Sequence, residues 1–295
     1  MNTGGRPDPF GTFAVYIKQR YGQNMKLFGL KSGENADQGL TVRSNIKYGD
    51  KHAFDVYRAG EERLPVVVHF AGAESGDRDS YAGMASYLAR LGFAVVVTEL
   101  PGGGAEENLT AARQLFEHLK FWGAGEKLDI NSTFFSGDGT GAWTAFTAGL
   151  KVDPEDNYCI KPMGLIGFSG VYEPMELAKL DYKGARRALK YGFGIGKEGT
   201  MADGVVSLIT ENAPPVFFAH SDGDGLSYAE TMLLKTALRR NGVAYSEFRA
   251  AFRRAKFDFY KKAASPEGAA ALRAAARFMT AVTDKTEFSG EYTEI

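Results

Sequence analysis

One stretch near the middle of the 295-residue chain constrains the fold more than any other. Residues 133–136 form a short, mostly apolar run, a glycine-rich turn follows, and residues 142–150 show the apolar spacing of a helix. This pattern predicts a β-strand that turns sharply into an α-helix. Gly137 and Gly141 lie two residues on either side of Gly139, as expected where a tight turn leaves no room for side chains.

On either side of this unit, apolar strand patterns alternate with amphipathic helix patterns. The predicted strands are 42–48, 54–57, 65–70, 93–98, 133–136, 163–167, 215–220 and 244–251. The predicted helices are 81–91, 109–122, 142–150, 229–240 and a last helix opened by Ser265-Pro266-Glu267. Nearly continuous apolar strands that alternate with helices indicate a parallel sheet covered on both faces. The prediction is an α/β fold with an eight-stranded, mostly parallel sheet flanked by helices.

The same patterns divide the chain into an extension and one domain. Residues 1–40 are expected to form an N-terminal extension or cap, with an amphipathic helix at about 10–21. Residues 41–295 are expected to form a single domain, because 44% hydrophobic residues suffice for one large core. Within it, residues 173–212 read as short helical pieces and turns, which predicts a small helical lid.

Composition excludes several classes of function. A formal net charge of −1 with balanced charges gives no reason to expect nucleic acid or an anionic membrane as a partner. Cys159 is the only cysteine, and the four histidines are not at metal-ligand spacing, so no internal disulfide, metal or cofactor is predicted. The N-terminus shows no signal-peptide pattern and no apolar run approaches the roughly 20 residues of a membrane helix. A cytoplasmic protein is expected.

In the order and spacing of its elements the chain resembles the α/β-hydrolase superfamily, and in particular the esterase/lipase branch with its carboxylesterases, feruloyl esterases and kynurenine formamidases. The likeness covers about residues 41–283. It is carried by a hairpin, a strand before an oxyanion loop, a nucleophile elbow, the segment after the sixth strand, and an acid strand and loop: 45–57, 65–68, 136–141, 167–172 and 214–224. The resemblance implies a Ser-His-Asp triad and an oxyanion loop at the carboxyl edge of the sheet.

The family's chemistry is only partly present. Gly139 stands where the family has its nucleophilic serine, so the elbow offers no side chain that can attack a substrate. Asp224 matches the triad acid in the family's Gly-x-x-Asp motif. The family's histidine falls on Lys256-Phe257, and either residue is a candidate for that position. Ordinary serine-ester hydrolysis from the elbow is therefore excluded.

The oxyanion loop is altered as well. The family's His-Gly-Gly-Gly reads Ala71-Gly72-Ala73-Glu74, and Glu74 brings a carboxylate to a site meant for negative charge. Thr140 opens the elbow helix, whose first N–H groups can receive a carbonyl oxygen or an anion. We therefore expect ligand contacts from Gly72, Ala73, Glu74, Gly139, Thr140, Phe257 and, at the pocket mouth, Tyr81.

The candidate catalytic residues are Asp224, Asp138 and Lys256, and each has a plainer interpretation. Asp138 is a nucleophile if the elbow is shifted by one residue, as in dehalogenases, or an elbow residue that makes local hydrogen bonds. Asp224 is a base towards a ligand or a hydrogen-bonded loop aspartate. Lys256 is a base or Schiff-base amine, or one solvated charge of the basic run 239–262.

Three functions remain open. The first is a non-hydrolytic enzyme, of lyase, cyclase or isomerase type, that acts on a small carbonyl-containing or aromatic substrate. The second is a catalytically inactive ligand-binding or regulatory protein, a path that hydrolase-fold hormone receptors have taken. The third is an esterase-like hydrolase with a relocated nucleophile. The expected partner is a small molecule, anionic or carrier-bound where the basic run receives it, and a homodimer is a further candidate.

Overall fold

The computed structural model describes residues 39–49, 51–73, 77–153, 155–157, 159–179, 183–194, 202–250, 258–286 and 290–294. The helix predicted at about residues 10–21 lies outside this part of the chain. Within the described segments, no helix is both long enough and apolar enough to cross a membrane.

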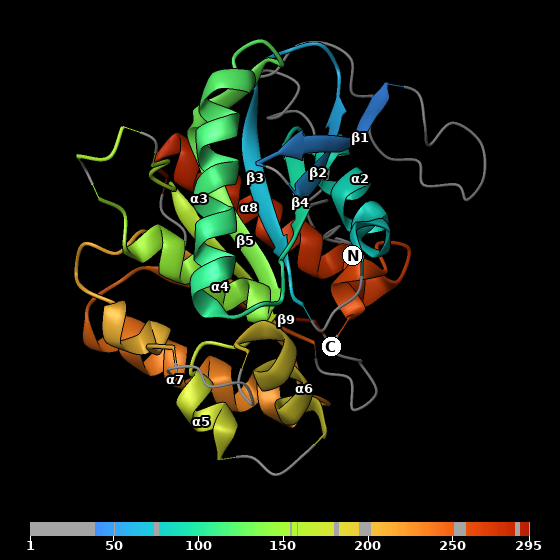
Figure 1. The fold of residues 1–295 in the computed structure, drawn as a ribbon. Helices are drawn as coiled ribbons and strands as arrows, with labels where there is room; N and C mark the ends of the chain where they lie inside the picture. The colour runs from blue at the N-terminus through green and yellow to red at the C-terminus, as the bar shows by residue number, and fades with distance from the viewer. Residues whose placement is uncertain are drawn as a thin grey trace, which may run out of the picture.

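The described strands form one nine-stranded sheet in the order β1-β2-β4-β3-β5-β6-β7-β8-β9 (Figure 1). β1 and β2 pair antiparallel with each other, β2 pairs antiparallel with β4, and every other pair is parallel. The eight predicted strands are confirmed, and β9 adds a ninth beside β8. The strand bounds are β1 Leu40–Tyr48, β2 His52–Ala59, β3 Leu64–Ala71, β4 Ala94–Glu99, β5 Leu128–Gly139, β6 Gly164–Gly170, β7 Val216–Ser221, β8 Tyr245–Ala250 and β9 Gly290–Glu294.

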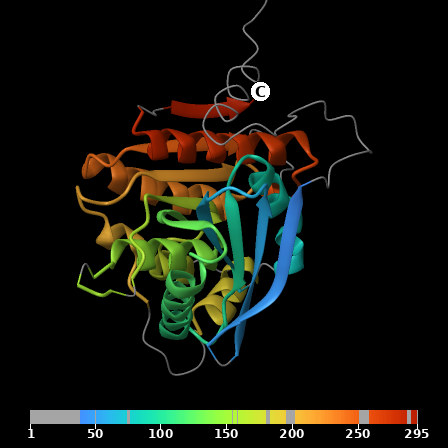
Figure 2. The ribbon, with the colours of Figure 1, turned by 90° about the horizontal axis from the view of Figure 1, so that it is seen from above.

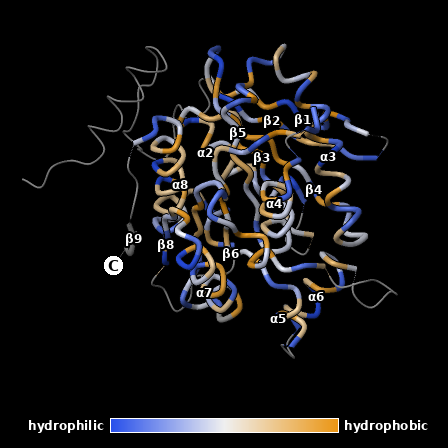
Figure 3. The backbone as a smooth tube through the Cα atoms, turned by 90° about the vertical axis from the view of Figure 1, so that its left-hand side faces the viewer, coloured by the Kyte–Doolittle hydropathy of each residue, from blue (hydrophilic) through white to orange (hydrophobic). Residues whose placement is uncertain are grey.

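Helices cover both faces of the sheet, as the alternating pattern predicts (Figures 1 and 2). α2 and α8 pack on one face, and α3, α4 and α7 pack on the other. Hydrophobic residues are concentrated in the strands between these helices (Figure 3). The bounds are η1 Arg78–Tyr81, α2 Ala82–Arg90, α3 Ala105–Trp122, α4 Thr140–Leu150, α5 Pro174–Ala178, α6 Lys183–Gly192, η2 Val205–Leu208, α7 Gly225–Arg240, η3 Phe259–Lys261 and α8 Pro266–Asp284.

Capping side chains set the starts of two helices, α7 and α8. α8 begins as predicted, because the Ser265 hydroxyl accepts a hydrogen bond from the Gly268 amide at 3.0 Å. α7 begins four residues earlier than predicted, because Asp224 is its N-cap and Asp224 Oδ1 accepts from the Leu226 amide at 3.2 Å. The predicted triad acid therefore has a local structural role at the end of β7.

Candidate functional site

The turn between β5 and α4 has the geometry of a sharp elbow. Gly139 ends β5 with φ 49° and ψ −125°, in a left-handed region that favours glycine. A Cβ at Gly137 would lie 2.2 Å from the Gly141 carbonyl oxygen, and a Cβ at Gly141 would lie 2.0 Å from the Phe70 carbonyl oxygen. Both flanking positions therefore require glycine, which explains the spacing seen in the sequence.

Asp138, the residue before the apex of the elbow, is the centre of a fully buried hydrogen-bond cluster. Its side chain is 0% exposed and accepts hydrogen bonds from three separate elements. The Gly72 amide donates to Oδ1 at 2.9 Å, and the Tyr81 hydroxyl donates to Oδ1 at 2.8 Å. The Tyr260 hydroxyl, from η3, donates to Oδ2. Asp138 thus ties β5 to the loop after β3, to η1 and to η3.

Two basic side chains complete the surroundings of Asp138. His69 Nε2 lies 3.6 Å from Asp138 Oδ1, and His69 Nδ1 lies 3.0 Å from the Ser136 hydroxyl oxygen. Lys261 Nζ lies 3.9 Å from Asp138 Oδ2 and 3.8 Å from the centre of the Tyr81 ring. The carboxylate therefore has both hydrogen-bond donors and a positive charge next to it in a buried environment.

These neighbours determine the charge of Asp138. Burial alone raises the pKa of the carboxyl, but His69, the positive charge of Lys261 and the Tyr260 hydrogen bond together hold that pKa well below its usual range. Burial lowers the pKa of His69, so its imidazole is neutral at neutral pH. Asp138 is therefore ionised at neutral pH and weakly basic. It is suited to positioning other groups and poorly suited to taking a proton from a substrate.

The two described residues that begin the loop after β3, Gly72 and Ala73, have their backbone donors already in use. The Gly72 amide donates to Asp138, and the Ala73 amide donates to the Thr140 hydroxyl oxygen at 3.2 Å. In the resembled family, amides of this loop stabilise an oxyanion. Here side chains of the elbow occupy the Gly72 and Ala73 amides, which holds these two residues against the start of α4.

The end of α6 packs on the start of the elbow helix. A Cβ at Gly192 would lie 2.1 Å from Thr140 Cγ2, so the two residues are in direct contact. The Asn108 side-chain amide fixes this position by donating to the Gly192 carbonyl oxygen at 2.8 Å. The segment predicted as a lid thus contains α5, α6 and η2, and α6 lies directly against the elbow.

Asp224 lies at the same edge of the sheet as the elbow. β5, β6 and β7 are adjacent and parallel, so Gly139 and Asp224 both follow carboxyl ends of strands. Asp224 Oδ1 caps α7, while Oδ2 is buried without a hydrogen-bond partner among the described residues. An unpaired buried carboxylate oxygen is costly, and it can accept one more hydrogen bond.

The structure brings five of the predicted site residues into one contact network: Gly72, Ala73, Asp138, Thr140 and Tyr81. Tyr81 was expected at the pocket mouth, but it is 0% exposed because its hydroxyl binds the buried carboxylate. Gly139 is at the apex of the turn. Glu74, Lys256 and Phe257 lie outside the described residues.

Sequence reasoning missed three members of the network: His69, Tyr260 and Lys261. The signal for His69 was present, since β5 residue Ser136 pairs with it across the sheet and both interrupt apolar strands. Tyr260 and Lys261 follow the basic run and had no strand or helix pattern to place them. Their positions depend on η3, which a single sequence does not reveal.

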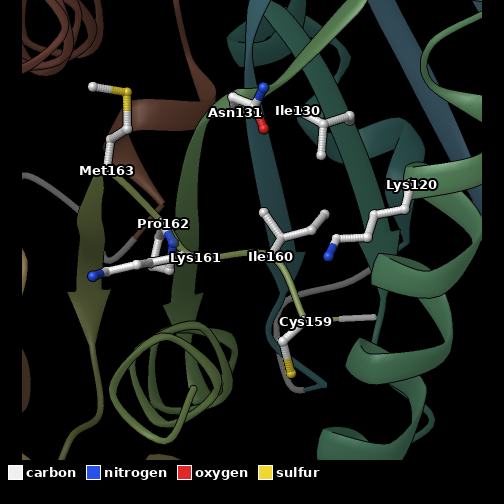
Figure 4. A pocket seen from close by; sticks show the side chains of 8 residues that line it. All are labelled: Lys120, Ile130, Asn131, Cys159, Ile160, Lys161, Pro162 and Met163. Atoms are coloured by element: carbon white, nitrogen blue, oxygen red, sulfur yellow. The ribbon is translucent and has the colours of Figure 1, made fainter. Parts of the chain in front are cut away.

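A surface depression of about 460 Å³ lies at the opposite edge of the sheet (Figure 4). It borders the amino ends of β5 and β6 and is lined by Lys120, Ile130, Asn131, Cys159, Ile160, Lys161, Pro162 and Met163. It shares no residue with the elbow network. Within the described segments, no group of three or more histidine, cysteine, aspartate or glutamate side chains is placed to hold a metal ion.

Comparison with known proteins identifies the fold. No family model and no curated protein sequence matches the chain. Among solved structures, esterase B from Lactobacillus rhamnosis is similar with a TM-score of 0.70 and 17% identity, over 94% of this chain and 93% of the other. Esterase LipW from Mycobacterium marinum gives 0.69 and 16% over 84% and 83%. A truncated carbohydrate esterase from gut microbiota gives 0.68 and 13% over 84% and 98%. The chain has the α/β-hydrolase fold of these esterases.

Proposed function

We propose that this chain binds a small carbonyl-containing or aromatic ligand beside Gly139 and acts on it without forming an acyl-enzyme. The observation that carries the proposal is the elbow, whose backbone makes the sharp turn while the residue at its apex has no side chain. An acyl-enzyme needs a nucleophilic side chain. The chemistry that remains is polarisation of a carbonyl group and transfer of a proton, as in a lyase, cyclase or isomerase.

Two features of the site support this chemistry. Gly139 is the N-cap of α4 and has no side chain that could accept a hydrogen bond from the first turn. The N–H groups and the positive dipole end of that turn therefore suit a carbonyl oxygen or an anion. Asp224 Oδ2, buried and unpaired, suits a proton donor on the ligand. Asp138 positions the loop and does not act as the base. Glu74 and Lys256 remain proposed contributors.

The saturation of the Asp138 network favours a second function, that of a catalytically inactive binding or regulatory protein. The Gly72 and Ala73 amides, which would stabilise a transition state, already have partners within the chain. A binding protein needs a rigid, shaped site and no group prepared for proton transfer. Turnover of a bound ligand separates the two functions.

Ser169 supports the third function, hydrolysis from a relocated nucleophile. It lies at the end of β6 with φ 45°, a left-handed conformation that is uncommon for residues other than glycine. The residue is 1% exposed and its hydroxyl has no hydrogen-bond partner among the described residues. The next residue, Gly170, pairs with Gly139 across β5 and β6, so Ser169 borders the elbow.

Labelling with a fluorophosphonate probe, followed by peptide mapping, tests the proposal. We expect no stoichiometric labelling and no hydrolysis of p-nitrophenyl acetate or butyrate above background, because Gly139 offers no hydroxyl. A Ser169→Ala variant is the matched control. Labelling that disappears in this variant would establish Ser169 as a reactive nucleophile and overturn the proposal. Labelling at any other serine would overturn it as well.

Restoration of the triad tests the same site from the opposite direction. Gly139→Ser alone should leave esterase activity negligible, because an unassisted hydroxyl needs an adjacent base. Adding Phe257→His should give more than the product of the single effects, since Asp224 can orient the imidazole. Glu74→Gly should then add about 10- to 100-fold through the oxyanion site. Strong activity from Gly139→Ser alone would mean that Lys256 already serves as the base.

A further inference from the structure

The outer face of α6 is made of basic side chains. Four of the ten residues of this helix are exposed cations: Lys183, Arg186, Arg187 and Lys190. The helix contains no acidic residue. Its other side is apolar and packs into the core through Ala185, Ala188 and Leu189. The apolar side of α6 is therefore used by the fold, and the basic side is presented to the surroundings.

The charges of this basic face repel one another. Arg187 lies four residues after Lys183. Lys190 likewise lies four residues after Arg186. Side chains at this spacing are neighbours on a helix surface, and like charges there destabilise the helix. Lys183 is also in the first turn, where the helix dipole disfavours a cation. The basic face is thus unfavourable by itself, and a bound anion would stabilise it.

Within the described part of the chain, three of these cations have no carboxylate partner: Lys183, Arg187 and Lys190. On α3, by contrast, Arg113 pairs with Glu117 at 3.5 Å. Arg187 and Lys190 instead lie over the ring of Tyr191, 6.0 Å and 5.3 Å from its centre. A ring leaves the hydrogen-bond donors of these cations available, so they can still bind carboxylates.

The apolar side chains beside the basic face are of the kinds found at protein interfaces. Tyr191 is 45% exposed, and Met175 on α5 is 49% exposed. α5 packs against α6, as Figure 1 shows. Arginine, tyrosine and methionine are enriched at protein–protein interfaces, and arginine and tyrosine are frequent among the residues that dominate binding energy. This composition fits a protein partner.

α6 is fixed next to the elbow. The Asn108 side chain donates to the Gly192 carbonyl oxygen at 2.8 Å, and Gly192 packs against Thr140 at the start of α4. A helix that is already ordered loses little conformational entropy when a partner binds. A partner bound to the basic face therefore lies beside the edge of the sheet that carries Gly139.

We propose that the outer face of α6 binds an acidic segment of a partner protein. The helix is about 15 Å long, which matches an extended segment of roughly four or five residues. Carboxylates of such a segment can bind Arg187 through two parallel hydrogen bonds, and Lys183 and Lys190 as point charges. Tyr191 supplies an aromatic contact at one end. This docking surface does not depend on the function proposed for the elbow.

Membranes and nucleic acids fit this face less well. A helix that binds a membrane buries an exposed apolar side, and the apolar side of α6 is already in the core. A Cβ at Gly104, the N-cap of α3, would lie 3.6 Å from the Phe193 carbonyl oxygen, so the start of α3 adjoins the end of α6. The first turn of α3 carries the exposed carboxylates of Glu106 and Glu107. An extended polyanion meets these carboxylates, whereas a short acidic segment does not.

Fluorescence anisotropy with a fluorescein-labelled oligoglutamate peptide tests the proposal on the full chain. We expect saturable binding that weakens as salt rises, because salt screens exposed charges. The triple variant Lys183→Glu/Arg187→Glu/Lys190→Glu should weaken binding by about tenfold or more. Absence of binding by the unmodified protein at low salt, or equal binding by the triple variant, would overturn the proposal.

The matched control reverses three exposed lysines outside α6: Lys47, Lys51 and Lys161. It changes the net charge by the same amount as the α6 variant, so a loss of less than about twofold is expected if the face itself binds. Equal losses in the two triple variants would show that net charge governs binding, which contradicts the proposal.

Vesicles that contain phosphatidylserine and duplex DNA are offered to the same three proteins. We expect both to bind more weakly than the peptide at equal salt. Tighter binding of either one, lost in the α6 variant, would assign the basic face to a membrane or to nucleic acid and overturn the proposal.

Lysine acetylation locates the bound peptide. Limited treatment with an N-hydroxysuccinimide ester of acetic acid modifies exposed lysines, and mass spectrometry measures the extent at each position. Bound peptide should protect Lys183 and Lys190 and leave Lys47 and Lys51 as reactive as before. Equal protection at all four lysines would show diffuse binding and contradict a docking surface on α6.

Discussion

Asp138 and Glu230 are both buried carboxylates that accept backbone hydrogen bonds, yet their protonation differs. Asp138, on the face covered by α2 and α8, has its pKa held below the usual range despite complete burial. Glu230, on α7, accepts from the Tyr172 amide at 2.7 Å and the Glu173 amide at 2.8 Å. Burial nevertheless raises the pKa of Glu230 to about 7.

The neighbouring charges account for the difference. Asp138 faces His69, the positive charge of Lys261 and two tyrosine hydroxyls. Glu230 faces the like charges of Glu173 and Glu176. Burial is similar in the two places, so it does not decide the outcome. The elbow is therefore held by a carboxylate that stays ionised over a wide pH range. The segment after β6 is held by one that titrates near neutrality.

The largest expected effect is the loss of Asp138. Asp138→Ala leaves two buried tyrosine hydroxyls and the Gly72 amide without their acceptor, so it should lower the free energy of unfolding by about 3–5 kcal/mol. Urea denaturation at pH 7 measures the change. Asp138→Asn, which keeps the shape and removes the charge, should cost less. A loss below about 1 kcal/mol for the alanine variant would show that the network is not a stabilising hub.

Two buried tyrosines, one beside each carboxylate, allow a matched pair of substitutions. Tyr81→Phe removes a hydrogen bond to an ionised carboxylate and should cost about 1.5–3 kcal/mol. Tyr172→Phe removes a buried hydroxyl that has no hydrogen-bond partner among the described residues, so it should be neutral or slightly stabilising. Thermal and urea unfolding of both variants measure the contrast. Equal losses would mean that burial of the ring, and not the hydroxyl, dominates at both sites.

Glu230 should give an effect of the opposite sign, a stabilisation that depends on pH. Because the folded pKa of Glu230 is raised from 4.5 to about 7, folding favours its protonated form, and stability falls as pH rises between these values. Glu230→Gln removes this penalty and should raise the free energy of unfolding by about 2–3 kcal/mol at pH 8, with little gain at pH 4. Urea denaturation across this range measures it. A gain independent of pH would assign the effect to packing.

In acid, the stability of the protein should depend on pH in the opposite direction, because of Asp138. Folding lowers the pKa of Asp138 from 3.8, so this carboxylate contributes to stability above pH 3.8. That contribution is lost as the pH falls below 3.8 towards the lower pKa of the folded state. Asp138→Asn should therefore flatten the loss of stability in acid, whereas Glu230→Gln should leave that limb unchanged. If both variants altered the same pH range, the proposed contrast between the two carboxylates would fail.

The fold followed from sequence more fully than the site did. Strands such as 65–70 and 215–220 are continuous apolar runs, so local pattern and tertiary burial agree. The glycine spacing around Gly139 located the elbow, because close backbone contact leaves a direct trace in the sequence. Tyr260 and Lys261 could not be placed, since they reach Asp138 across more than 120 positions of chain. β9 was missed because its segment lacks an apolar run.

The backbone of Gly139 has a consequence for sequence change at the elbow. At φ 49° and ψ −125°, a residue with a side chain is strained by about 1–3 kcal/mol, whereas glycine is not. A change from glycine to serine here would lower stability at once, and any catalytic gain would wait for a base at a second position. Selection for stability alone therefore opposes the first step of that path. Loss of a side chain at position 139 is therefore easier to fix than its return.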